Sequence, residues 1–206
     1  MIAKEVINAL KTLATEDRRK TNEWFFKTNK GQYGYGDIFL GVRTPDVRDV
    51  AKRFSQTITL IELTELIQNS IHEVRLCALI ILVNKYNKNE PDRIYKYYLK
   101  HLNSVNNWDL VDTSAPHIIG DYLYNNLEKS EILLEFSRSE NLWIRRSSIV
   151  STFAFINNNE FKFFPLIETQ ALIIHENNSK GVFVRSYDED DLKNKKNSRK
   201  KIPINY

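Results

Sequence analysis

The sequence predicts an all-α protein, an α-solenoid of antiparallel helix pairs, and three observations support this fold class. Apolar residues recur at three- and four-residue spacing in segments 61–67 and 74–86, as on one face of a helix. No run of alternating apolar and polar residues indicates a strand. A sequence frame also repeats with a period near 35 residues, which is typical of stacked helical repeats.

The repeated frame begins with a ring-bearing residue and continues into small and aliphatic residues. Its three copies start at His72, Trp108 and Trp143, which are 36 and 35 positions apart. Two helices per unit of this length form an α-solenoid. The alternative is three ordinary amphipathic helices that happen to be evenly spaced.

Local signals place the remaining elements. The first ten residues form an amphipathic helix with an acidic first turn. Glycines crowd residues 31–41, which predicts a loop, and Pro45 suits the first position of a helix that begins near Thr44. Pro91 suits the first turn of another helix. Further polar joints are expected at residues 125–126 and 137–141.

We expect two regions in the chain. Residues 1–156 form the helical repeat domain, and residues 157–206 contain a degenerate or truncated last repeat and a polar tail. The periodic pattern decays after residue 157, and Pro165 falls inside what should be the next helix. An acidic run at 188–191 and a basic run at 193–201 are typical of a disordered tail.

Composition excludes several classes of protein. The 206 residues are 42% hydrophobic and 27% charged, as in a globular protein. No stretch reaches the ~20 apolar residues of a membrane helix, and the N-terminus lacks a secretory signal pattern. The single Cys77 excludes a disulfide framework, and the four His residues have no metal-ligand spacing. We expect a cytoplasmic monomer without metal or cofactor. Its net charge of +4 favours a polyanionic partner.

The chemistry-bearing segment is 106–116. On a helix, Trp108 and Asp112 lie one turn apart on one face, with Asp109 near it. Trp143 and Arg146 form a second aromatic and charged pair one repeat later. A carboxylate beside an indole can stabilise a developing positive charge and hold a water. The structural alternative is that both tryptophans are inter-repeat core, Asp109 is a helix-terminus charge and Arg146 pairs with Asp112.

Other candidates carry weaker signals. The glycine-rich segment that leads to Arg43 either permits close phosphate approach or simply shapes a turn. A basic stripe on the following helix either binds DNA or is a solvated face, and it consists of Arg48, Lys52 and Arg53. We interpret His72 as a helix-start or packing residue and Cys77 as core.

Four motifs occur in the order found in one known family. They are DIFLGVRTPDVR at 37–48, IHEVRL at 71–76, NWDLVD at 107–112 and NLWIRR at 141–146. Over residues up to about Thr152 the chain resembles the AlkD-like DNA alkylation repair enzymes, which are HEAT-like-repeat DNA glycosylases. The resemblance implies excision of cationic N3- and N7-alkylated purines from duplex DNA.

The resemblance also implies roles for individual residues. Asp112 matches the catalytic aspartate, Trp108 an aromatic residue that packs on the lesion's deoxyribose, and Arg146 an arginine that holds the DNA backbone. We add Trp143 to these, and the basic residues Arg43, Arg48 and Lys52 as DNA contacts. The chain departs from the family where members carry a helix of the type KAxGWxLRE, because no Trp follows Trp143. The alternatives are therefore a non-catalytic duplex-DNA-binding protein and a protein-binding scaffold.

Overall fold

The structure, a computed structural model, describes residues 1–86 and 90–158 and is mainly helical in both ranges. No strand occurs there, and the β-pairing is an isolated parallel bridge between Ile38 and Ile71. The all-α prediction is confirmed. The α-helices are α1 Ile2–Thr12, α2 Glu16–Phe25, α3 Thr44–Phe54, α4 Leu60–Ile67, α5 His72–Tyr86, α6 Pro91–Lys100, α7 Trp108–Ala115, α8 Asp121–Tyr124, α9 Ile132–Ser137 and α10 Leu142–Asn157.

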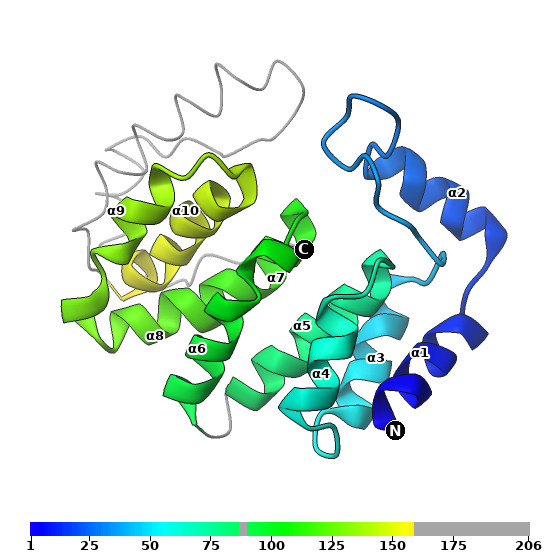
Figure 1. Cartoon of the computed structure of the whole chain (residues 1–206), viewed down its shortest axis with the longest axis horizontal. Helices are drawn as coiled ribbons and strands as arrows, with labels where there is room; N and C mark the ends of the chain where they lie inside the picture. The colour runs from blue at the N-terminus through cyan, green and yellow to red at the C-terminus, as the bar shows by residue number, and fades with distance from the viewer. Residues whose placement is uncertain (87–89, 159–206) are drawn as a thin grey trace, which may run out of the picture.

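Apart from α2, which stands away from the other helices, the helices pack in two layers (Figure 1). In the inner layer, α3 contacts α5, α5 contacts α7, and α7 contacts α10. In the outer layer, α1 packs on α3 and α4, while α4 and α6 pack on α5 and α9 packs on α10. This succession of paired helices is an α-solenoid, as the repeat spacing predicts.

The three copies of the sequence frame lie at the starts of inner-layer helices. α5 begins at His72, α7 at Trp108 and α10 at Leu142. The side chains of Asn107 and Asn141 cap the last two by accepting the backbone N–H of Trp108 and Trp143. Because the helices are equivalent members of successive repeats, their first turns lie at one edge of the layer.

α7 ends at Ala115, but Pro116 does not end the helical path of the chain, although a proline inside a helix removes a backbone donor. The chain instead passes through a π-helical turn, Pro116–Gly120, directly into α8. Gly120 then allows α10 to come close, since a Cβ at Gly120 would lie 2.5 Å from the carbonyl oxygen of Ser151. This close approach packs the C-terminal half of α10 against the π-helical turn, and α10 also contacts α7.

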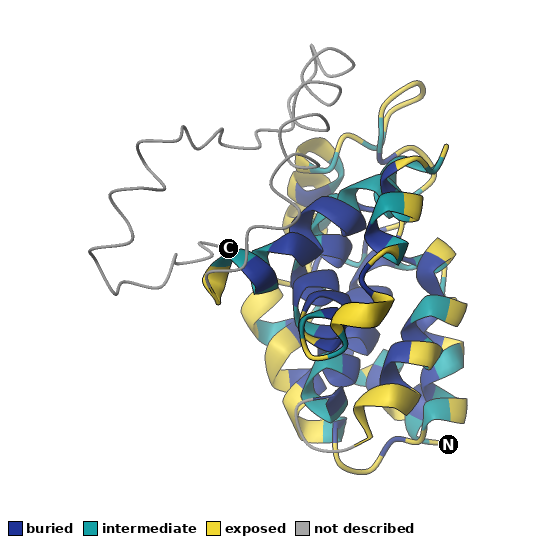
Figure 2. Cartoon of the chain, turned by 90° about the vertical axis from the view of Figure 1, so that its left-hand side faces the viewer, coloured by how far each residue is buried: buried dark blue, intermediate teal, exposed yellow. Residues whose placement is uncertain are grey.

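The core lies between the two layers, as the burial-coloured ribbon illustrates (Figure 2). Cys77 is fully buried on α5, so its prediction as a core residue is confirmed. The predicted degenerate repeat and tail at 157–206 lie outside the described residues from 159 onward.

Candidate functional site

A groove of about 780 Å³ opens where the first turns of α3, α5 and α7 face α2 and the loop after it. Aromatic rings line it, among them Phe25, Phe26 and Trp108. Its charged lining includes the carboxylates of Asp109 and Asp112 and the guanidinium groups of Arg18 and Arg48. The groove therefore combines stacking surfaces with charges of both signs.

Asp112 lies on α7 in this groove, and Arg146 reaches it from α10. The Arg146 Nε and Nη2 atoms donate to the two Asp112 carboxylate oxygens, both at 2.7 Å. The Arg146 side chain is 13% exposed and that of Asp112 is 26% exposed, so solvent reaches both partners. Arg146 thus pairs with Asp112, as the structural alternative in the sequence analysis expects, and the Asp112 carboxylate still borders the groove.

Trp108 is held by aromatic neighbours on the N-terminal side of the groove. Phe26 stacks on the indole with ring centroids 5.5 Å apart, and Phe25 meets it edge-on at 5.9 Å. The indole Nε1–H donates to the Tyr33 hydroxyl at 3.3 Å. Since Trp108 lines the groove one helical turn before Asp112, the ring and the carboxylate border the same space.

His72, a buried residue of the groove lining, bridges two carboxylates. Its Nε2 lies 2.8 Å from Asp109 Oδ2 and its Nδ1 lies 3.2 Å from Asp37 Oδ2. Burial lowers the pKa of His72, but Asp109 and Asp37 outweigh this effect and raise the pKa to about 9. The imidazole is therefore a cation at neutral pH, and both ring nitrogens donate.

Asp37 is the centre of a larger network. Besides His72, it accepts hydrogen bonds from Arg75 Nη2 at 2.6 Å and from Asn107 Nδ2 at 2.8 Å. Burial tends to raise the pKa of Asp37, yet the hydrogen bond from His72 and the charge of Arg75 lower it overall. The network joins the loop after α2 to the first turns of α5 and α7.

Glu73 fastens the neighbouring part of the loop. Its buried carboxylate accepts the backbone N–H groups of Leu40 and Gly41, both at 2.9 Å. Gly41 has a positive φ of 88°, and a Cβ there would lie 2.2 Å from the carbonyl oxygen of Thr15. Gly41 therefore lets the loop pass close to the start of α2, which supports the turn-shaping interpretation of the glycines.

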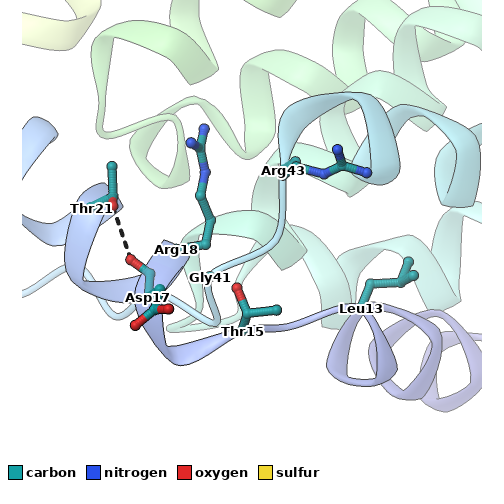
Figure 3. A pocket seen from close by; sticks show the side chains of 7 residues that line it. All are labelled: Leu13, Thr15, Asp17, Arg18, Thr21, Gly41 and Arg43. Carbon is teal, nitrogen blue, oxygen red and sulfur yellow. Dashed lines mark hydrogen bonds between the residues drawn. The ribbon is translucent and has the colours of Figure 1, made fainter.

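The other predicted site residues occupy different places. Arg48 lines the groove, whereas Arg43 and Lys52 are exposed and are not among the groove-lining residues. Arg43 lines a smaller neighbouring pocket (Figure 3) and bonds Asp46 bidentately at 2.8 and 2.9 Å. Trp143 lies outside the groove lining and meets Tyr33 edge-on at 6.0 Å.

Sequence reasoning missed Arg18, which lines both the groove and the neighbouring pocket (Figure 3). It also missed Tyr33, Asp37 and Glu73. His72 does begin a helix and stacks on Phe39, as interpreted, but it is also a buried cation. The motif at 71–76 could have indicated these contacts, because closely spaced His, Glu and Arg residues at the start of a helix need polar partners if they are buried.

Residues 1–86 and 90–158 offer neither a grouped set of metal ligands nor a membrane-spanning helix. In these ranges no three His, Cys, Asp or Glu side chains are grouped so that they hold a metal ion. Each helix of the same part of the chain is too short or too polar to cross a bilayer.

The fold and groove together define a helical-repeat protein with an aromatic and carboxylate site at one edge of its inner layer. The chain belongs to the DNA alkylation repair enzyme family, whose model matches residues 6–179. The match extends beyond Thr152, where the motif resemblance ends. The family assigns the chain to DNA repair, with DNA as its partner. No curated protein matches the sequence.

Proposed function

We propose that the chain is a DNA glycosylase that removes cationic N3- and N7-alkylated purines from duplex DNA. The observation that carries the proposal is the position of Asp112. It is a partly exposed carboxylate at the border of an open groove, one helical turn from the Trp108 indole. Family membership supplies the partner, and this pair supplies groups suited to the chemistry.

The reaction breaks the N-glycosidic bond and needs little acid catalysis. An alkylated purine already carries a positive charge, so it leaves as a neutral base and takes the bonding electron pair with it. The sugar becomes oxocarbenium-like and is attacked by water, which loses a proton. A carboxylate at the groove border stabilises the sugar cation and accepts that proton, as in glycoside hydrolysis. The Trp108 indole adds cation–π attraction to the same charge.

Arg146 connects DNA binding with this chemistry. A guanidinium binds a phosphate as readily as a carboxylate, in both cases with two parallel hydrogen bonds. A backbone phosphate that reaches Arg146 therefore replaces Asp112 as its partner and releases the carboxylate toward the sugar. Arg18 and Arg48, which also line the groove, contribute further phosphate contacts.

The second candidate function is duplex-DNA binding without catalysis. It is favoured by the bidentate contact of Arg146 with Asp112, which neutralises the carboxylate in the free protein. In this case Asp112 organises the arginine and performs no chemistry.

Asp112→Asn distinguishes the two functions because it keeps the size of the side chain and removes its charge. We expect release of 7-methylguanine from methylated duplex to slow by about two orders of magnitude. Affinity for unmodified duplex should hold or rise, because Arg146 is freed. Asp49→Asn makes the same change at an exposed carboxylate of α3 and should leave excision unchanged. Equal excision by wild type and Asp112→Asn would contradict a catalytic Asp112. Duplex binding without any excision would favour the non-catalytic protein.

A further inference from the structure

Tyr33, on the loop between α2 and α3, touches both tryptophans of the inner layer. Its hydroxyl accepts the Nε1–H of Trp108 at 3.3 Å, and its ring meets Trp143 edge-on at 6.0 Å. The hydroxyl also donates to the Phe25 carbonyl oxygen at 3.5 Å. Tyr33 is absent from the groove lining, so any effect it has on the groove acts through its neighbours.

The Trp108 ring is fixed from two directions. Phe26 stacks against the indole with an interplanar angle of 21°, which restrains its tilt. Stacking alone is compatible with both indole orientations that a 180° rotation about the Cβ–Cγ bond relates. The hydrogen bond to Tyr33 removes this freedom, because Nε1 is the single donor of the indole and has a fixed place on the ring.

The loop that carries Tyr33 is itself anchored. Asp37, four residues later, is bonded to His72, Arg75 and Asn107. Within the loop, the Gly34 backbone N–H donates to the Lys27 carbonyl oxygen at 3.2 Å. Tyr33 is therefore presented from an anchored loop.

We propose that Tyr33 is a positioning residue that sets the orientation of the Trp108 indole beside Asp112. Its hydroxyl selects the ring orientation whose free surface borders the groove. The consequence for base excision rests on the proposed glycosylase function, whereas the orientation of the ring does not. Burial raises the pKa of Tyr33, so the hydroxyl remains protonated at neutral pH and retains its donor to Phe25.

The test compares Tyr33→Phe with Tyr35→Phe. Both remove one hydroxyl from the same loop, but Tyr35 is 65% exposed. In Tyr33→Phe we expect single-turnover release of 7-methylguanine to slow by about three- to tenfold, as for one lost hydrogen bond. Duplex affinity should stay within about twofold, because no phosphate contact changes. Tyr35→Phe should match wild type in both measurements.

A second measurement is independent of activity. In NMR spectra, the indole N–H resonance of Trp108 is assigned by its loss in Trp108→Phe. This resonance should shift, and its proton should exchange faster with solvent, in Tyr33→Phe but not in Tyr35→Phe. An unchanged resonance overturns the proposal. A shifted resonance with an unchanged excision rate also overturns Tyr33 as a positioning residue for catalysis. If wild type releases no base, the proposed function fails by itself, and the resonance decides whether Tyr33 sets the ring.

Discussion

Replacing His72 by Gln tests the buried charge network in the wall of the groove. Gln keeps hydrogen-bonding capacity but cannot carry the positive charge that faces Asp37 and Asp109. The pKa of His72 is about 9 in the folded protein, against 6.5 for a free histidine. A difference of this size corresponds to about 3 kcal/mol of folding free energy.

The sign of the pH dependence follows from the direction of this shift. Because the folded pKa of His72 is raised, its stabilisation is fully present below about pH 6.5. The contribution is lost as the pH rises through about 9. The difference in unfolding free energy between wild type and His72→Gln should therefore be about 3 kcal/mol larger at pH 6 than at pH 9.5.

Urea titrations followed by circular dichroism at several pH values measure this difference. His101→Gln is the control. Burial lowers the pKa of His101, so the titration of His101 changes the unfolding free energy only in the range below about pH 6.5. The pH dependence of His101→Gln above pH 7 should therefore match that of wild type. If wild type and His72→Gln lose stability in parallel between about pH 6.5 and 9, the imidazolium bridge is refuted.

Two further predictions concern DNA contacts and the loop. Arg18→Ala should reduce the slope of the logarithm of duplex affinity against the logarithm of salt concentration by about one. Arg43→Ala should change this slope less, because Arg43 is already neutralised by Asp46. Equal slopes for the two variants would contradict a phosphate contact by Arg18. Gly41→Ala should lower the unfolding free energy by more than about 2 kcal/mol, because its Cβ would collide with the start of α2. Gly31→Ala, at a similar φ of 82° with nothing within 4 Å, should cost only about 1 kcal/mol in a urea titration.

Much of the architecture was predictable because it depends on local rules. Apolar spacing located α4 and α5, and prolines marked the starts of α3 and α6. The continuation of the helix through Pro116 was not predictable in this way. It depends on the π-helical turn between α7 and α8 and on the contact of Gly120 with α10, which only the packed repeats reveal.

The candidate site was predictable along one helix and not across the fold. Trp108 and Asp112 are four residues apart, so their common face followed from helical periodicity. The partners of His72 lie 35 and 37 positions away, at Asp37 and Asp109, and periodicity contains no information on such contacts. For the same reason, periodicity could not predict the hydrogen bond between Tyr33 and Trp108, which are 75 positions apart.

The carboxylates of the groove differ in how firmly they are held, and this difference favours Asp112 as the reactive group. Glu73 is buried and accepts several backbone N–H groups, while Asp109, 12% exposed, is bound to the His72 cation. Drawing either toward a substrate would leave buried donors or a buried charge without a partner, which is costly. Asp112 is 26% exposed, and its partner Arg146 can turn to a phosphate. Among these three, Asp112 is therefore the carboxylate that can change partner without leaving an orphaned charge in the core.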